Sequence, residues 1–445
     1  MDILRTAGEK VLAAARAKGV EAEAFLLRQR ELSIEVIDGR VETLKEAEEQ
    51  GLGIRVVRGG QLGFVYTSDL SDFALKEAVE DAISISRYTV ADRHNVLPEG
   101  GFSYPFMELY DNNINYTSLE EKTEMAREVE KAARSNDHRV SIIERAGYED
   151  GEFTTFVMNT RGLYAAGRAN YSGLYIFLVA EEGNDAQNGF AFMTRKRIKD
   201  LNPENVGREA AYRAVRSLNA RTIKSAQIPC VLEPYVATRF LGLLAQSADA
   251  EAAQKGKSMW KGLEGQEVAS SKFSLVDDST YRDGIAAFPF DGEGVPGQRN
   301  VVVRDGVLQT LLYDSYTAGK AGCQSTGNGQ RGSFRGLPSV GTSNFMIAPG
   351  KESPDKLIGD INRGLYVTEV MGMHTANPIS GDFSLGAAGI MIENGRLTYP
   401  VRGATIAGNM VNFLKDIEEL GSDMRFFGSR AAPTVRLNSL SVAGE

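Results

Sequence analysis

Length, composition and charge narrow the class of protein. The chain has 445 residues, too many for one ordinary core, and is 42% hydrophobic and 24% charged, as is typical of globular proteins. Its formal net charge of −9, without a long run of Lys and Arg, argues against nucleic acid as a partner. It has no signal-peptide core, no bilayer-spanning apolar stretch and no CxxC between its two cysteines. We therefore expect a cytoplasmic protein with no membrane partner.

The beginning of the chain alternates helical and hairpin patterns. Apolar spacing predicts a helix over residues 2–18. Residues 23–67 then alternate in polarity, and Asp38-Gly39 and Gly59-Gly60 are dipeptides that supply the positive φ of two-residue hairpin turns. A second helix is predicted over 70–87, followed by a loop over 88–116.

A third helix should begin near Thr117 or Ser118. Each is followed three residues later by Glu, which gives two overlapping capping-box frames, and the helix should reach about residue 134. Strands are predicted over 140–148, 153–159 and 164–180. Asn202-Pro203 begins a helix that ends near residue 218. The polar joint at 219–227 separates two predicted domains, residues 1–220 and 221–445.

The second domain is rich in glycine and should form a cleft. Patterns predict a helix over 234–253, hairpins around Asp305-Gly306 and Asn394-Gly395, and a short helix over 353–363. Strands over 228–232 and 434–442 complete the set. Many hairpins and few crossover helices predict an α+β fold, with two domains of antiparallel β-hairpins and packed helices.

Histidine is scarce. His94, His138 and His374 are the three histidines, and no two of them lie within a helical turn or two of each other. A zinc peptidase usually needs two histidines close together on one helix and a nearby carboxylate. We therefore expect no metal ligand and no cofactor in this chain.

The loop 372–384 is the densest polar cluster in the sequence. It could form a cleft wall that offers side chains and amides to a ligand, or a long turn whose Asn, Ser and Asp bond their own backbone. A triad of Ser380, His374 and Asp382 would need a strained nucleophile turn, which is absent, so no catalytic residue is assigned. The candidate substrate-cleft residues in this loop are His374, Thr375, Asn377, Ser380 and Asp382.

Three other segments carry weaker signals. Gly327 to Gly332 lacks the Lys-Ser/Thr of a phosphate-binding loop, and its polar residues Asn328 and Arg331 remain candidates for the substrate cleft. Asp291-Gly292-Glu293-Gly294 lacks further acids at EF-hand offsets, which predicts a solvated turn. Trp260 is expected to pack on a surface.

Several motifs of the second half, taken in order, resemble the TldD/PmbA family, also called the modulator of DNA gyrase family. The first half has the opening expected of that family, a helix and then hairpins with Asp38-Gly39-Arg40. The motifs include Phe290-Asp291-Gly292-Glu293-Gly294-Val295-Pro296-Gly297, Ser325-Thr326-Gly327-Asn328-Gly329, Ser380-Gly381-Asp382-Phe383-Ser384 and Pro400-Val401-Arg402-Gly403-Ala404-Thr405.

The resemblance has a specific implication for zinc. In the TldD branch a helix carries an HExxxH motif, and a cysteine near the C-terminus completes the site. The corresponding helix here includes Leu243 to Ala250 without histidine, and Phe427 to Glu445 holds no cysteine. The chain is therefore similar to the PmbA (TldE) branch. This implies that the chain joins a TldD-like homologous subunit, which holds the zinc, and that the resulting heterodimer degrades unfolded peptides.

Two other functions stay open at this point. The chain could be a stand-alone homodimeric peptide-binding or interaction module without a proteolytic role. It could also be an independent hydrolase with an unrecognised site.

Overall fold

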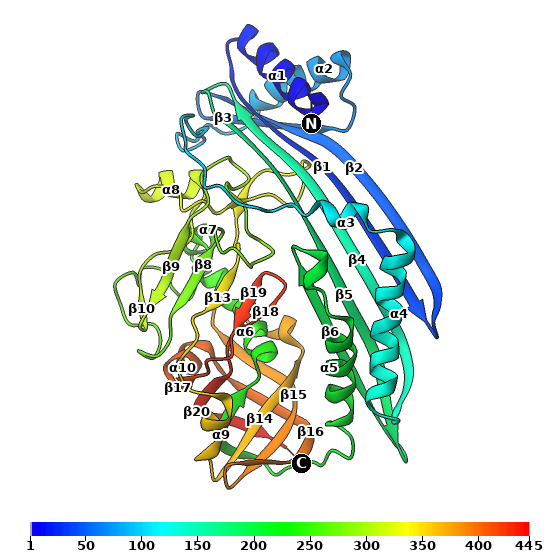
Figure 1. Cartoon of the computed structure of the whole chain (residues 1–445). Helices are drawn as coiled ribbons and strands as arrows, with labels where there is room; N and C mark the ends of the chain where they lie inside the picture. Colours follow the sequence, from blue (N-terminus) through cyan, green and yellow to red (C-terminus); the bar gives the residue numbers. More distant parts are fainter. Residues whose placement is uncertain (1, 445) are drawn as a thin grey trace.

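A long antiparallel sheet is the main structural element of the first half. The computed structural model describes residues 2–444, and within them this sheet has six strands in the order β3-β2-β1-β4-β5-β6. Its longest strands run along one whole side of the molecule (Figure 1). The predicted turns at Asp38-Gly39 and Gly59-Gly60 are confirmed, since all four residues have positive φ. The strands are β1 (Glu21–Ile37), β2 (Arg40–Arg58), β3 (Gln61–Thr67), β4 (Val140–Asn159), β5 (Tyr164–Glu182) and β6 (Asp185–Arg195).

The prediction of two short strands over 140–148 and 153–159 is wrong, because β4 is continuous. Its Gly147 and Gly151 are not turn residues. They lie directly across from Tyr175 and Tyr171 of β5. A Cβ at either glycine would lie 2.4–2.5 Å from the facing tyrosine ring. The glycines therefore make room for aromatic rings across the sheet, as aromatic side chains often cover glycine in strands.

Helices cover two regions of this sheet. Of the two predicted N-cap positions, Thr117 and Ser118, the structure has Ser118. Its side chain and that of Glu121 form the capping box of α4. Asn202 caps α5 and Pro203 is its first residue, as predicted. The described helices of this half are α1 (Asp2–Ala17), α2 (Asp72–Ser86), α3 (Asn112–Tyr116), α4 (Leu119–Asn136), the 3-10 turn η1 (Ile198–Asp200) and α5 (Pro203–Val215).

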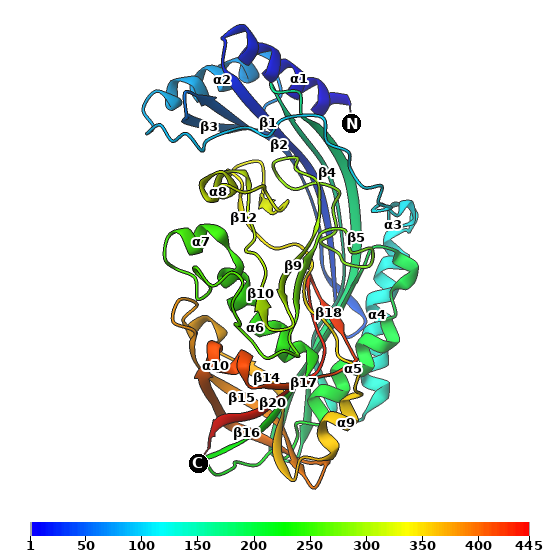
Figure 2. The ribbon, with the colours of Figure 1, turned by 90° about the vertical axis from the view of Figure 1, so that its left-hand side faces the viewer.

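Side chains of β1 point alternately to the two faces of the sheet, so one face packs against helices and the other against the second half. Ala24 and Leu26 pack in a core with α1 and α2, and Ile34 packs in another core with α4 and α5. Phe25 and Leu27 point to the other face and pack against residues of the second half. Figure 2 shows the result, a curved sheet with the second half on its inner side.

The second half contains two larger sheets among its described residues. One has six strands in the order β10-β9-β8-β13-β19-β18, and the other has the order β16-β15-β14-β7-β20-β17. In the latter sheet β16 also pairs with β20, so the sheet closes on itself. The strands are β7 (Ala226–Leu232), β8 (Leu275–Asp278), β9 (Arg299–Arg304), β10 (Val307–Leu308), β13 (Phe345–Ile347), β14 (Arg363–Met371), β15 (Asp382–Glu393), β16 (Arg396–Asn409), β17 (Ile417–Leu420), β18 (Arg425–Phe427), β19 (Arg430–Ala432) and β20 (Val435–Ala443), with β11 (Gly329–Gln330) and β12 (Ser339–Val340) as a separate pair.

The helix predicted over 234–253 is broken in two. Asp249 ends α6 (Pro234–Ala248) and accepts hydrogen bonds from the first backbone amides of α7 (Ala250–Gln254). The other described helical segments of this half are α8 (Ser315–Ala321), α9 (Pro354–Gly359), α10 (Met410–Lys415) and the 3-10 turn η2 (Met373–Thr375).

Trp260 is buried at 2% exposure, so the expectation of a surface position is wrong. The reason is local. The Ser258 hydroxyl donates to the Ser247 carbonyl of α6 at 2.6 Å and accepts from the Trp260 amide at 3.0 Å. These bonds hold the indole in the core of the second half.

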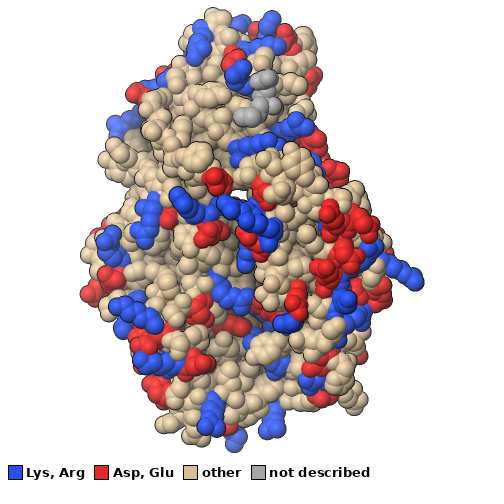
Figure 3. Space-filling model, in the orientation of Figure 1, with Lys and Arg blue, Asp and Glu red and all other residues tan. Residues whose placement is uncertain are grey.

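Two properties bear on what the surface can contact. Among residues 2–444, no helix combines the length and the apolar character needed to cross a membrane. Figure 3 shows acidic and basic side chains interspersed over the face drawn, so neither sign covers it. The mixed α+β fold is confirmed.

Candidate functional site

The loop 372–384, predicted as a cleft wall, is an exposed turn that bonds largely to itself. The Asn377 side-chain oxygen accepts from the backbone amides of Ile379 at 2.9 Å and Ser380 at 3.2 Å. The Ser380 hydroxyl donates to Asp382 Oδ2 at 2.7 Å. The other Asp382 oxygen accepts from Asn409 Nδ2 at 2.8 Å. Three of the five candidate side chains therefore stabilise the turn.

His374 and Thr375 lie in the 3-10 turn η2 of the same loop and are exposed. Thr375 donates its hydroxyl to the Gly372 carbonyl at 2.8 Å. The His374 ring makes no hydrogen bond within residues 2–444. Of the loop candidates, His374 is therefore the one whose polar atoms remain open to solvent or to another molecule.

Asn328 is fully buried, at 0% exposure. Its Nδ2 donates to Asp277 Oδ2 at 2.7 Å and to the Gly341 carbonyl at 2.8 Å. Its Oδ1 accepts from Asn300 at 3.1 Å and from the Thr326 hydroxyl at 2.7 Å. The amide thus ties the glycine-rich loop to β8 and β9.

Arg331 is also buried, between the two halves of the chain. Its Nε donates to the Gly292 carbonyl at 2.7 Å and its Nη1 to the Gly336 carbonyl at 3.0 Å. The guanidinium pairs with Glu23 of β1 and lies 4.8 Å over the Phe25 ring. Within the described chain, no hydrogen bond or ion pair joins Asn328 or Arg331 to the loop 372–384. The sequence candidates therefore form two separate groups.

Arg331 belongs to a buried cluster of charges that the sequence did not reveal. Glu23 and Arg55 are cross-strand partners on β1 and β2, joined at 2.7 Å. Arg55 also donates to Glu293 Oε1 at 3.1 Å, and Glu293 Oε2 accepts from the Ser315 amide at 2.7 Å. The prediction of a solvated turn at 291–294 is wrong, because β2 brings Arg55 to it and Glu293 is 1% exposed.

Two further carboxyls of the second half are buried, Asp291 beside Glu293 and Asp277 beside Asn328. Asp291 accepts from the backbone amides of Glu293 and Val295, at 2.9 and 3.0 Å, and its pKa is raised by burial and by the Glu293 charge. Asp277 accepts from the Ser343 amide at 2.7 Å, and burial raises its pKa to about 6. The acidic pair Asp291 and Glu293 within a glycine-rich motif was the available sequence signal.

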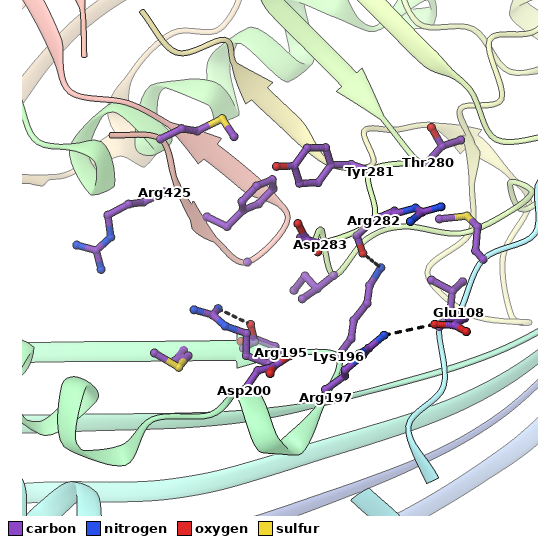
Figure 4. A pocket seen from close by; sticks show the side chains of 18 of the residues that line it. Glu108, Arg195, Lys196, Arg197, Asp200, Thr280, Tyr281, Arg282, Asp283 and Arg425 are labelled. Atoms are coloured by element: carbon purple, nitrogen blue, oxygen red, sulfur yellow. Dashed lines mark hydrogen bonds and ion pairs between the residues drawn. The ribbon is translucent and has the colours of Figure 1, made fainter. Parts of the chain in front are cut away.

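A large cleft lies along an edge of the first-half sheet. It has a volume of about 1010 Å³ and is lined by the consecutive residues 192–197, which face 280–283 and 424–426 of the second half (Figure 4). Consecutive lining residues mean that the cleft follows the edge of β6 and not one of its faces. In their sheets β6 and β18 are both outer strands, so two strand edges border the same space.

The side chains of this cleft are of mixed charge and partly aromatic. Lys196 Nζ donates to the Arg282 carbonyl at 2.7 Å, and burial lowers the pKa of Lys196 to about 8. Arg197 pairs with Glu108 at 3.3 Å, as Figure 4 shows. Phe106 lines the cleft and is 91% exposed. The cleft therefore presents both apolar and charged side chains.

A smaller hollow lies beside the end of α6, at the segment that the family resemblance aligns with the zinc motif. It has a volume of about 440 Å³, and Ala245, Gln246 and Asp249 are among its lining residues. Asp249 accepts from the amides of Glu251 and Ala252 at 2.7 and 3.2 Å, so its carboxylate is engaged. In the part of the chain that the structure describes, no group of three or more His, Cys, Asp and Glu could hold a metal ion.

Comparison with known proteins agrees with this architecture. Models of the PmbA/TldA metallopeptidase domain 1, central domain and C-terminal domain match residues 22–86, 112–218 and 225–444. The metalloprotease PmbA of Escherichia coli O157:H7 is 29% identical over 100% of this chain and 96% of its own length. A TldD metalloprotease homologue of Haemophilus influenzae is 27% identical over 83% of this chain and 78% of its own.

A solved structure extends the likeness to three dimensions. A putative modulator of a DNA gyrase from Thermotoga maritima has a TM-score of 0.92 at 30% identity, covering 99% of this chain and 100% of that one. The fold and the matches define a peptidase-related α+β protein. The chain belongs to the PmbA/TldD metallopeptidase family.

Proposed function

We propose that this chain is a PmbA-type (TldE-type) subunit that joins a TldD-like homologous subunit in a cytoplasmic complex degrading unfolded peptides. The chain itself supplies no zinc ligands, and the zinc is held by the partner. The observation that carries the proposal is the end of α6, where Ala245, Gln246 and Asp249 line the hollow in place of histidines. A zinc site of a peptidase needs three protein ligands with an open fourth position.

The two subunits then have different tasks. Zinc lowers the pKa of its bound water to about 7 and polarises the scissile carbonyl, which a subunit without ligands cannot do. This chain contributes binding surface. The edges of β6 and β18 border a cleft of about 1010 Å³, which in this proposal holds an extended peptide. Free strand edges offer main-chain hydrogen bonds that are independent of peptide sequence, which suits unfolded substrates.

The loop 372–384 has a place in this proposal as a surface facing the partner's zinc. His374 is exposed, and the rest of the loop is held by its own hydrogen bonds. A stable turn that presents one open imidazole can position a peptide without any change in the turn itself. Thr375, Asn377, Ser380 and Asp382 then act by holding the shape of the loop.

The test is reconstitution with a TldD-like homologue that carries the HExxxH motif, to be sought in the genome that encodes this chain. We expect the two chains to co-purify, unfolded peptides to be cleaved by the pair, and this chain alone to be inactive and free of stoichiometric zinc after dialysis. A partner with the glutamate of its HExxxH motif changed to glutamine is the control, and it should bind but not cleave.

Other outcomes would overturn the proposal. About one zinc per chain in this subunit alone, or cleavage by it alone, would make it an independent hydrolase. A stable homodimer by light scattering that binds peptides and ignores the TldD-like homologue would favour the stand-alone peptide-binding module.

A further inference from the structure

One face of α6 carries a row of partly open side chains. Tyr235, Arg239, Gly242 and Gln246 follow each other at intervals of three or four residues, so they share a helix face. Each of the four is exposed or half-buried, while most of the helix is buried. This row leads from the N-terminal end of α6 toward the hollow beside Gln246.

Arg430 of β19 lies directly on this row. A Cβ built at Gly242 would be 3.1 Å from Arg430 Nη1, so the glycine makes room for the guanidinium. Arg239 is one helical turn before Gly242 on the same face. Two guanidinium-bearing side chains are thus brought to one place by a helix and a strand.

The hairpin of β18 and β19 adds an apolar wall. Phe427 and Arg430 are direct cross-strand partners, so their side chains leave the hairpin on the same face. The Phe427 ring lies 5.2 Å from the Tyr235 ring of α6. Both rings are half-buried.

The charges of the two arginines are not balanced. Within residues 2–444, neither Arg239 nor Arg430 has an ion pair or a side-chain hydrogen bond. Neighbouring arginines differ, since Arg213 and Arg425 share Glu209, at 2.6 and 2.7 Å. Burial and then the Arg239 charge lower the pKa of Arg430. A half-buried guanidinium beside a like charge is unfavourable unless an anion joins it.

We propose that Arg239 and Arg430 form a binding site for an oxyanion, a carboxylate or a phosphate group, with Tyr235 and Phe427 as its apolar wall. Guanidinium groups bind carboxylate and phosphate oxygens through paired N–H bonds. Among the described residues, no Asp or Glu forms an ion pair with Arg239 or Arg430. The site needs residues of this chain alone and does not depend on a peptidase partner. A peptide C-terminus and a free or esterified phosphate are the two sources of such a group.

The experiment is calorimetric titration of the full chain with sodium phosphate and with sodium acetate, at constant ionic strength set by chloride. We expect saturable binding of at least one of them by the wild type. R239Q and R430Q should each weaken it about tenfold, the effect of losing one charge-assisted hydrogen bond. R430K should weaken binding less than R430Q, because it keeps the charge and loses the paired donors.

The matched control is R396Q, which removes an exposed arginine on β16 with the same change of charge. It should bind like the wild type. Without added oxyanion, R239Q should melt at the same temperature as the wild type or higher, because a repulsion is relieved. If R430Q fails to fold, the exposed Arg239 still gives a test.

Peptides identify the source of the anion. A short peptide with a free C-terminus that binds while its C-terminal amide does not would identify a peptide carboxylate. Binding of phosphate without acetate or peptide would identify a phosphate ligand. No saturable binding of any of them, or an equal loss in R396Q, would overturn the site.

Discussion

Two polar segments of the second half, the loop 372–384 and the glycine-rich segment 291–297, both contain carboxylates but differ in exposure. The loop 372–384 is an exposed turn whose carboxylate Asp382 is bonded to Ser380 and Asn409. The segment 291–297 buries Asp291 and Glu293 against β1 and β2 of the first half. The difference comes from what lies opposite. Only the buried segment meets the cross-strand pair Glu23 and Arg55.

This contrast separates two ways in which polar residues stabilise a loop. In the exposed turn each hydrogen bond competes with water and contributes little. The junction between the two halves consists of Glu23, Arg55, Glu293 and Arg331. Here the charges of both halves depend on each other, because a buried charge without its partner is costly. Substitutions at matched positions should therefore have unequal effects.

The largest effect is expected at the junction. Glu293→Ala leaves Arg55 buried with Glu23 as its remaining carboxylate and should lower the free energy of unfolding by about 3–5 kcal/mol. Urea denaturation followed by circular dichroism measures it. The control is Glu80→Ala, which breaks the exposed Lys18–Glu80 pair and should leave the denaturation midpoint unchanged. Equal shifts in the two variants would remove the contrast between junction and surface.

A smaller effect should appear as pH dependence at Asp277. Its pKa is about 6 in the folded chain, against a usual 3.8, and the gap corresponds to about 3 kcal/mol. Between about pH 4 and 6 the unfolded chain releases this proton while the folded chain keeps it. The stabilisation of the folded state by the protonated Asp277 is therefore complete at low pH and is lost as the pH rises through 6.

Comparison with Asp277→Asn isolates this contribution. The stability of the wild type relative to the variant should fall by about 2 kcal/mol from pH 4.5 to 7. Asp382, whose pKa is lowered by Asn409 and Ser380, has the opposite sign and titrates below this window. Asp382→Asn should therefore show no change relative to the wild type over the same range. A constant difference for Asp277→Asn would refute burial as the dominant influence.

The smallest effects are expected in the exposed loop. Asn377→Ala loses the bonds to two backbone amides and should cost about 1 kcal/mol. His374→Ala should change stability by less than about 0.5 kcal/mol. If the loop faces the partner's zinc, His374→Ala should still slow peptide cleavage by the reconstituted complex about tenfold. Wild-type cleavage by that variant would leave the loop with a structural role alone.

Local chemistry made the hairpins and helix starts predictable. Asp305-Gly306 and Asn394-Gly395 adopt the positive φ that their types favour, and the hairpins form around them. The helix α9 starts after Ser353, close to the predicted position, and the Ser353 side chain caps it by accepting from the amide of Lys356. In each case the residues that decide the structure lie within a few positions of one another.

Contacts between distant residues were not predictable in the same way. Arg55 and Glu293 are 238 positions apart, and nothing near Glu293 indicates that an arginine will cover it. The continuity of β4 through Gly151 was not predictable, because the tyrosine that covers this glycine, Tyr171, is on the next strand. The candidate residues of the loop 372–384 were identified by residue type. Their exposure depends on whether another part of the chain packs over the loop, which residue types do not determine.

The closed sheet of the second half has a consequence for protein engineering. Ala226 of β7 pairs with Val442 of β20, and the Gly444 amide donates to the Ser225 hydroxyl at 3.0 Å. The polypeptide thus enters and leaves this half at the same point. A segment with adjacent ends can be spliced into a surface loop of a host protein without stretching either. Residues 225–444 have such adjacent ends, and a host protein would also have to replace Arg55 and Glu23 as the partners of Glu293 and Arg331.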